Sequence, residues 1–266
     1  MPKPSRLRIA LALSGSDPSG GAGLEADLKV FQSHGVYGMA VPTLLTVQNT
    51  LGVRRVKTLE PAFFEEQVAF LLEDIFPDVI KIGAIGDRRM LQALVRLLSQ
   101  ERLAKIPVVI DTVMGATSGA SLFDMRGLPE FIERLLPRAA VITPNVPEFD
   151  LLTGKATTPE NAAEHLHAFG RDKPYAILLK GGHFPGPPID FLWHAGALRS
   201  YSGERIDTPH THGTGCALAS ALAANLALGL PVPDAAAQAR AYVREAIRRN
   251  PGLGNGRGPL GLHVER

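Results

Sequence analysis

Short apolar runs alternate with helical patterns along almost the whole chain, and this alternation restricts the possible folds more than any other feature of the sequence. The runs expected to form strands cover residues 8–13, 41–47, 78–82, 108–110, 140–142 and 175–180, with a hairpin over 191–198 that turns at Gly196. Repeated β-α-β order requires parallel strands, and the crossover helices then cover both faces of the sheet. The sequence therefore predicts an α/β fold with a mostly parallel central sheet.

Apolar residues at helical spacing mark the segments between the strands. In the first of these segments, Leu24, Leu28 and Phe31 share one face, and further along Asp87 is placed to cap a helix. The other expected helices cover residues 68–75, 91–98, 128–135, 159–169 and 234–249, with one more after Cys216. No repeat, linker or change in composition divides the chain, so we expect a single domain over residues 1–266.

Composition and charge exclude several classes of partner. The net charge is only +2, and no basic stripe with interleaved aromatic residues is present, so we expect no nucleic-acid partner. No apolar stretch approaches the roughly 18 residues that a membrane span needs, so we expect no membrane association. The chain has one cysteine, which rules out an intramolecular disulfide and favours a cytoplasmic location.

Polar and glycine-rich segments follow the expected strands at the points where they end. In open parallel sheets, ligands bind beyond the carboxyl ends of the strands, where neighbouring loops meet. The segments concerned are residues 14–23, Gln48-Asn49, Asp111-Thr112, residues 145–148 and residues 181–183. We expect them to converge on one cleft.

The segment Gly213-Thr214-Gly215-Cys216 leads into an alanine- and leucine-rich run that predicts a helix. Glycines before a helix let several backbone N–H groups point at one spot, and the helix start adds positive potential, so an anion such as phosphate fits there. A helix start also favours a thiolate, which makes Cys216 a candidate proton acceptor. The alternative interpretation is a glycine-rich turn with a buried cysteine.

Four polar residues near strand ends are candidates for binding roles. Asp111 and Glu148 suit Mg²⁺, which is usually held by carboxylates, water and substrate phosphates, although each could instead cap a helix or bond to a loop. Lys180 could reach a phosphate, or simply extend to solvent from the end of its strand. Gln48 could hydrogen-bond a flat heterocycle, because an amide both donates and accepts, or could be an ordinary loop residue.

Two common nucleotide-binding motifs are incomplete. Residues 15–20 have the glycine spacing of a Walker loop, but Gly21 stands where that motif has lysine. Gly213 and Gly215 lack the third glycine of a dinucleotide fingerprint, since Leu218 occupies its position. A dinucleotide-binding fold is therefore not supported.

Taken together, these segments resemble the hydroxymethylpyrimidine/phosphomethylpyrimidine kinase family. The resemblance runs in order from about residue 8 to residue 263, and the ordered set is far more specific than any one motif. The matching segments are residues 14–23, Ala26-Asp27-Leu28-Lys29, Val47-Gln48-Asn49-Thr50, Lys81-Ile82-Gly83, Asp111-Thr112-Val113-Met114, Thr143-Pro144-Asn145, Pro147-Glu148, Lys180-Gly181-Gly182-His183, residues 212–216 and the glycine pattern of residues 254–259.

The resemblance implies the ribokinase-like fold, a three-layer α/β/α sandwich, and a homodimer. It also implies an ATP- and Mg²⁺-dependent kinase of thiamine biosynthesis. The substrate in that family is 4-amino-5-hydroxymethyl-2-methylpyrimidine, which is phosphorylated on its hydroxymethyl group and then phosphorylated again as the monophosphate.

The resemblance also implies a role for each candidate residue. Gln48 would hydrogen-bond the pyrimidine, with Gly15 and Asp27 beside it. Gly213, Thr214, Gly215 and Cys216 would form the anion hole, with Cys216 where most ribokinase relatives place an aspartate base. Lys180 and Asn145 would lie on the ATP side, and Asp111 and Glu148 would organise Mg²⁺.

Two departures from the family pattern leave an alternative open. The family often has methionine after Lys-Ile-Gly, where this chain has Ala84, and a lysine that many members carry is replaced by Thr117. A wider pocket at Ala84 would suit a pyridoxal or pyridoxine kinase of the same fold. An alternative of another class is a protein that binds a pyrimidine or nucleotide without turnover, although such a protein would not need Asp111, Glu148, Lys180 and Cys216 together.

Overall fold

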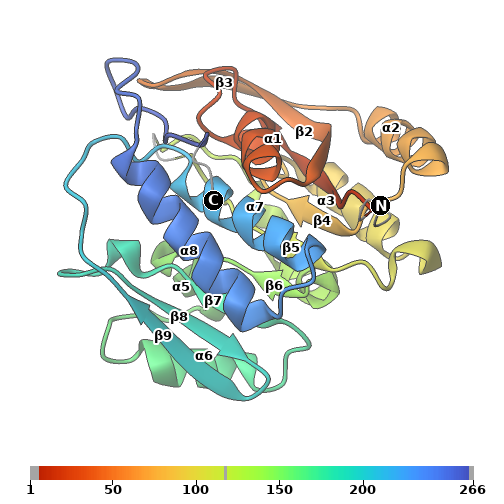
Figure 1. Ribbon diagram of the computed structural model, residues 1–266. Helices are drawn as coiled ribbons and strands as arrows, with labels where there is room; N and C mark the ends of the chain where they lie inside the picture. Colours follow the sequence, from red (N-terminus) through yellow and green to blue (C-terminus); the bar gives the residue numbers. More distant parts are fainter. Residues whose placement is uncertain (1–5, 117–118, 264–266) are drawn as a thin grey trace, which may run out of the picture.

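The computed structural model describes residues 6–116 and 119–263, and within these ranges the chain forms one nine-stranded sheet of order β3-β2-β1-β4-β5-β6-β7-β8-β9 (Figure 1). The strands are β1 Ile9–Ser16, β2 Tyr37–Asn49, β3 Gly52–Thr58, β4 Val79–Ile82, β5 Val108–Ile110, β6 Val141–Ile142, β7 Ala176–Leu179, β8 Ile189–His194 and β9 Ala197–Ser202. The six central strands from β2 to β7 are parallel, and β3, β8 and β9 pair antiparallel at the two edges.

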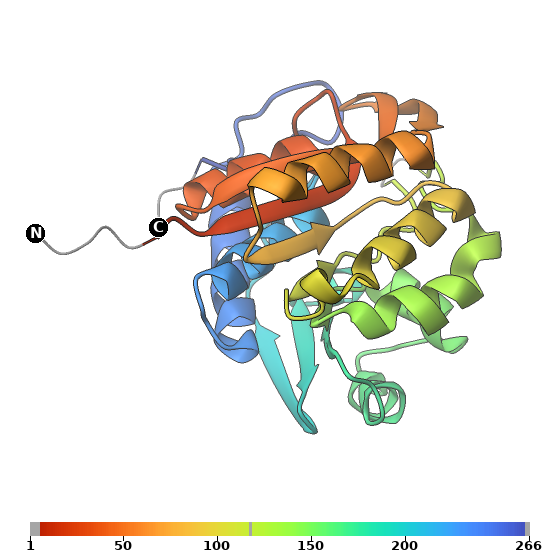
Figure 2. The same ribbon diagram turned by 90° about the vertical axis from the view of Figure 1, so that its right-hand side faces the viewer.

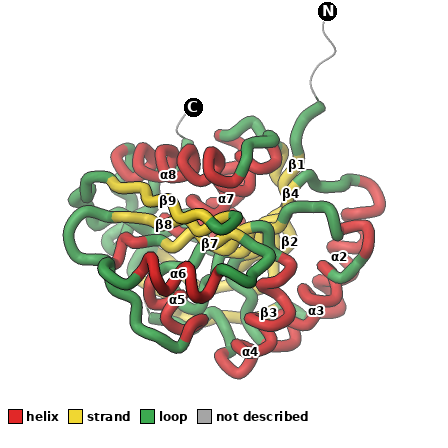
Figure 3. Tube along the Cα trace, turned by 90° about the horizontal axis from the view of Figure 1, so that it is seen from below, coloured by secondary structure: helices red, strands yellow, loops and turns green. Residues whose placement is uncertain are grey.

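Helices cover both faces of this sheet (Figures 2 and 3). One layer contains α1 Gly23–Ser33, α7 Thr214–Ala227 and α8 Val232–Arg248. The other contains α2 Pro61–Asp74, α3 Arg88–Leu98, α4 Leu128–Glu130 with the π-helix Phe131–Leu135, α5 Val146–Thr153 and α6 Ala162–Gly170. Short 3-10 turns lie at Glu101–Leu103, Met125–Gly127, Leu136–Arg138 and Gly181–His183.

Alternation along the strands divides the core between the two layers. Ala10 and Ala12 of β1 pack with α1, α7 and α8, whereas Leu11 and Leu13 pack with the opposite layer. Successive strand side chains point to opposite faces, so each buried strand supplies both cores. Small side chains face α7, which is buried along most of its length, and this packing fixes where α7 begins.

The predicted α/β class with a mostly parallel sheet is confirmed, and so is the hairpin that turns at Gly196. The predicted cap at Asp87 is also confirmed, because its side chain accepts a hydrogen bond from the Met90 backbone N–H. No helix in the described ranges is long and apolar enough to cross a membrane.

Some predicted boundaries were wrong. β2 extends over Tyr37–Asn49 rather than 41–47, and the prediction omitted its antiparallel partner β3. The prediction also omitted α5, which follows Asn145 directly. The helix expected from residue 159 begins at Ala162, after a turn.

Candidate active site

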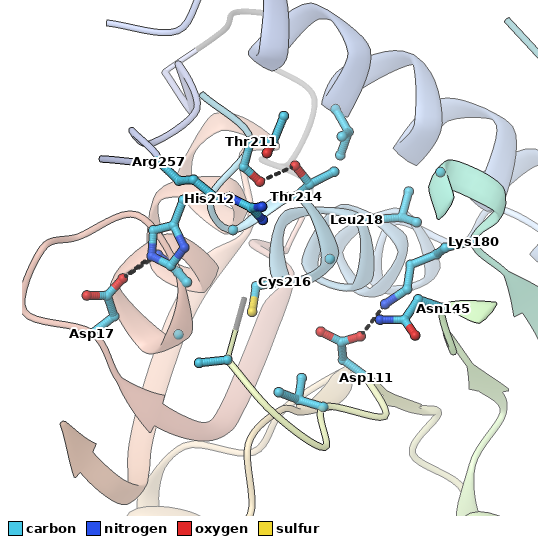
Figure 4. Close-up of a pocket in the computed structure, with 18 of the residues that line it drawn as sticks. Asp17, Asp111, Asn145, Lys180, Thr211, His212, Thr214, Cys216, Leu218 and Arg257 are labelled. Carbon is cyan, nitrogen blue, oxygen red and sulfur yellow. Dashed lines mark hydrogen bonds and ion pairs between the residues drawn. The ribbon is translucent and has the colours of Figure 1, made fainter. Parts of the chain in front are cut away.

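A cleft of about 900 Å³ opens at the carboxyl ends of the parallel strands (Figure 4). Its walls include residues that follow or end four different strands, namely Gly15, Asp111, Asn145 and Lys180. The opposite wall is formed by the segment that enters α7 and by the first turn of that helix. The predicted convergence of the strand ends on one cleft is therefore confirmed.

The start of α7 requires glycine. Gly213 is the N-cap with φ of 83°, a left-handed conformation that glycine adopts without strain. A Cβ at Gly213 would lie 1.8 Å from the Gly21 backbone oxygen, and a Cβ at Gly215 would lie 3.2 Å from Lys180 Nζ. The first N–H groups of a helix have no intrahelical partner, so this turn offers donors and positive potential beside Lys180.

Lys180 lies between two carboxylates. Its Nζ donates to Asp111 Oδ1 at 2.9 Å and lies 3.8 Å from Glu148 Oε2. Asp111 Oδ1 also accepts from Thr143 Oγ1 at 3.0 Å. This places two carboxylates and one ammonium group from neighbouring strand ends at one side of the cleft, next to the first turn of α7.

These groups shift one another's pKa. Burial favours a neutral Asp111, but the charges of Lys180 and Lys81 together with the hydrogen bonds from Lys180 and Thr143 outweigh burial and lower the pKa of this carboxyl. Burial raises the pKa of Glu148, and the charge of Asp111 adds to the rise against the opposing effect of Lys180. Burial disfavours the Lys180 cation, yet Asp111 and Glu148 raise its pKa above the ordinary value. Lys180 is therefore charged at neutral pH.

Asn145 and Glu148 form a reciprocal cap at the start of α5. Asn145 Oδ1 accepts from the Glu148 N–H at 2.8 Å, and Glu148 Oε2 accepts from the Asn145 N–H at 2.8 Å. Thr112 Oγ1 also donates to Glu148 Oε2, at 3.0 Å. The alternative of a helix cap is correct for Glu148, and both residues also line the cleft.

Cys216 lies in the first turn of α7 and lines the cleft. The loss of hydration around its thiol raises the pKa to about 11, against a lowering effect of the Lys81 charge and a further raising effect of the Asp111 charge. The expectation that the helix start would favour a thiolate was therefore wrong. Desolvation and the charges of Asp111 and Asp27 outweigh the Lys81 charge and the hydrogen bond with the Gly23 backbone, which both lower the pKa of this thiol.

Gln48, His212 and Asp17 meet at the other end of the cleft. His212 Nε2 lies 2.7 Å from Asp17 Oδ2 and 3.3 Å from Gln48 Nε2. Burial alone would raise the pKa of Asp17, but hydrogen bonds from His212 and Ser19 lower it. This pair links the loop after β1 to the segment before α7, and it holds the Gln48 amide at the wall of the cleft.

Small and aliphatic residues line part of the same cleft as Gln48. These residues include Gly15, Leu44 and Ala84, and a Cβ at Gly15 would lie 2.6 Å from Leu44 Cδ1 and 3.4 Å from the Ala84 Cβ. A side chain at position 15 would therefore have to displace the end of the Leu44 side chain. The role of Gly15 beside the substrate stays a prediction.

Asp27 does not line the cleft, so the predicted substrate contact is corrected. Its carboxylate is fully buried and accepts from Lys81 Nζ at 2.8 Å to both oxygens and from Ser220 Oγ at 2.6 Å. Every strong interaction of Asp27 is thus internal. It joins α1, β4 and α7 beneath the cleft.

Sequence reasoning gave no role to Lys81, Asp17, Arg205 or Arg257. Lys81 had a usable signal, because a lysine inside the apolar strand Val79–Ile82 must have a buried anionic partner. The others lie in loops without periodicity, and only the fold brings them to the cleft. Thr117, which replaces the family lysine, lies outside the described residues.

The part of the chain that is similar to known proteins includes both helical layers and the cleft. The family described as phosphomethylpyrimidine kinase matches residues 17–261. A hydroxymethylpyrimidine/phosphomethylpyrimidine kinase of Synechococcus elongatus is 40% identical over 259 residues, which cover 95% of this chain and 96% of that protein. The thiamine biosynthesis bifunctional protein ThiED of Geobacter sulfurreducens is 41% identical over 255 residues, which cover 94% of this chain and 51% of that protein. The ADP complex of Bacillus subtilis pyridoxal kinase has a TM-score of 0.85 and 30% identity, and the match covers 96% of each chain.

Proposed function

The chain belongs to the phosphomethylpyrimidine kinase family, and we propose that it transfers the γ-phosphoryl group of ATP to 4-amino-5-hydroxymethyl-2-methylpyrimidine and then to the monophosphate, as a step of thiamine biosynthesis. Its fold is the ribokinase-like α/β/α sandwich, and the proposed catalytic domain spans residues 1–266. One observation carries the proposal. A single cleft holds the Lys180–Asp111–Glu148 cluster beside the start of α7, and its lining also includes Gln48 and the small or apolar residues Gly15, Leu44 and Ala84.

Phosphoryl transfer depends mainly on the alignment of the reacting groups and on neutralisation of their negative charge, and little on covalent catalysis by the protein. The hydroxymethyl oxygen of the substrate attacks the γ-phosphorus of ATP, the bond to the β–γ bridging oxygen breaks, and that oxygen leaves with ADP. Negative charge spreads over the transferring group. The N–H groups of residues 213–216 and the Lys180 ammonium are placed to stabilise that charge.

Mg²⁺ is expected to accompany ATP, and the residues fit it. Burial raises the pKa of Glu148 and the nearby Asp111 charge adds to the rise, so a bound cation would favour the charged form of this carboxyl. These two carboxylates would hold the ion, which usually takes one or two carboxylates with water and phosphate oxygens. When bound, it supplies further neutralisation of phosphate charge.

The hydroxyl proton must leave during the first step, and Cys216 is our candidate to receive it. With a pKa of about 11, only about one thiol in 10⁴ is ionised at pH 7. A loose transition state needs little help from a base, so we expect Cys216 to contribute modestly to kcat. In the second step the nucleophile is a phosphate oxygen that carries no proton.

The test is ADP release with ATP and Mg²⁺ on the hydroxymethylpyrimidine, its monophosphate and pyridoxal in parallel. Turnover of both pyrimidines, with much slower turnover of pyridoxal, is the expected result. Absence of turnover on all three would favour the binding-protein alternative.

Pyridoxal phosphorylation is the second candidate, because Ala84 presents only a methyl group to the pyrimidine pocket. The similarity to a pyridoxal kinase structure supports the same alternative. A preference for pyridoxal in the assay would select it. We also propose a homodimer in the cytoplasm, as the resemblance implies, and light scattering giving about twice the 28.4 kDa of one chain would support the dimer.

A further inference from the structure

Arg257 differs from the other cationic side chains that line the cleft. Within the described ranges, its guanidinium makes no hydrogen bond or ion pair with another residue. The others are all engaged: Lys180 with Asp111, Arg240 with Asp190, Arg205 with the carbonyl groups of residues 182, 184 and 186, and Arg244 with the Glu204 carbonyl. Arg257 is exposed and lines the cleft, so its positive charge is available there to a ligand.

The backbone around Arg257 is firmly held. Its N–H donates to the Thr50 oxygen at 3.0 Å, and a Cβ at Gly256 would lie 2.1 Å from that same oxygen. On its other side, the His212 N–H donates to the Gly258 oxygen at 3.2 Å. The segment is therefore fixed between the turn that follows Gln48 and the segment that enters α7.

This position lies between the two functional ends of the cleft. Thr50 is two residues from Gln48, and His212 directly precedes the N-cap of α7. Figure 4 shows the Arg257 side chain extending toward the start of α7, beside His212 and Thr214. The Arg257 charge also reaches His183 across the cleft, where it contributes to lowering the pKa of that residue after burial and Lys180.

The two pyrimidine substrates of the proposed function differ in charge at the hydroxymethyl position. The hydroxymethylpyrimidine is uncharged there, whereas its monophosphate carries about −1.5 to −2 near pH 7. In the second step a phosphate oxygen of the monophosphate attacks the γ-phosphorus of ATP, and the β–γ bridging oxygen leaves with ADP. A second anion is therefore brought beside a site whose Lys180 and helix start already face ATP.

We propose that Arg257 binds the phosphate group of the monophosphate substrate and so determines specificity for the second phosphorylation. Arginine suits this task, because its planar guanidinium can bind two phosphate oxygens at once. The proposal rests on the proposed function, since it requires the monophosphate to occupy the pocket beside Gln48.

The experiment compares Arg257→Gln with the wild type on the two pyrimidines separately, at saturating ATP. We expect kcat/KM for the monophosphate to fall at least about tenfold further than kcat/KM for the hydroxymethylpyrimidine, chiefly through KM. The equilibrium Kd for the monophosphate without ATP should rise by a similar factor. Arg257→Lys should recover part of both losses, because lysine restores the positive charge but not the planar group that binds two phosphate oxygens at once.

Arg199→Gln is the matched control, since Arg199 is exposed on the edge strand β9 and does not line the cleft. It should change neither step. Equal losses on both substrates, or a rise in KM for ATP with Arg257→Gln, would overturn the assignment and give Arg257 to the nucleotide. If wild-type protein turned over neither pyrimidine, the proposed function itself would fail, which is a distinct result.

Discussion

Lys180 Nζ donates to Asp111 Oδ1 at 2.9 Å across two strand ends that are 69 residues apart in sequence. The Lys180 side chain is only 15% exposed and the Asp111 side chain 1%, so neither charge is well hydrated. The pair keeps Lys180 charged beside the anion-binding turn of α7. This ion pair therefore both stabilises the local structure and maintains the positive charge that the proposed reaction needs.

Replacing Lys180 by Gln should remove the positive charge and leave a donor for Asp111. We expect kcat/KM to fall by about 10²-fold or more on either pyrimidine, because charge on the transferring phosphoryl group loses a major stabilising group. The measurement is steady-state ADP release. Lys155→Gln, at an exposed position, is the control, and a Lys180→Gln enzyme within threefold of wild type would remove Lys180 from the mechanism.

Lys81→Met should destabilise the fold strongly, by about 3 kcal/mol or more in urea unfolding, because it leaves the Asp27 carboxylate buried without its cation. Adding Asp27→Asn should recover part of the loss. The double variant should also bind the pyrimidine with nearly unchanged KM, since Asp27 lies beneath the cleft. A large KM increase in a well-folded double variant would restore Asp27 as a substrate contact.

The raised pKa of Cys216 predicts slow alkylation at neutral pH. Only the thiolate reacts, so the iodoacetamide rate should rise about tenfold per pH unit from pH 7 to pH 10 and level off near pH 11. Because Cys216 is the single cysteine of the chain, the reaction reports on this thiol alone. A rate that levels off near pH 8 would show an activated thiolate, and circular dichroism checks that the fold persists.

Cys216→Ala should lower kcat with little change in KM for ATP. The anion-binding turn is built from backbone N–H groups, which the substitution leaves in place. Steady-state kinetics on the hydroxymethylpyrimidine measure the effect. An unchanged kcat would exclude Cys216 as the proton acceptor.

Gln48→Ala should raise KM for the pyrimidine far more than KM for ATP, because Gln48 lines the cleft beside His212 and is the residue proposed to hydrogen-bond the pyrimidine. His212 would also lose a neighbour at 3.3 Å. A parallel rise in both KM values would identify Gln48 as a structural residue instead.

Much of the site followed from one rule about parallel sheets. Asp111 and Lys180 come directly after short buried runs and Asn145 follows a third such run by three residues, and the carboxyl ends of such strands must meet at one edge. Their convergence could therefore be predicted without knowing any contact. The reciprocal cap of Asn145 and Glu148 also has a local sequence signal, although the prediction missed the helix that it starts.

The remaining features depend on contacts distant in sequence. Asp27 pairs with Lys81, 54 residues away, and no local pattern shows that α1 points this carboxylate inward. The pKa of Cys216 depends on depth and on the sum of several charges, so the helix start alone gave the wrong direction. β3 is a strand because β2 pairs with it, and its own residues carry little apolar signal.

The cleft joins segments from opposite parts of the chain, because the loop after β1 contacts the segment around His212, which is in turn hydrogen-bonded to the segment around Arg257. A nascent polypeptide leaving the ribosome completes the whole sheet through β9 before α7 and α8 are made. Until then, one apolar face of the sheet has only α1 to cover it. Such a half-covered intermediate is a natural client for chaperones, and phosphoryl transfer can begin only when synthesis is nearly finished.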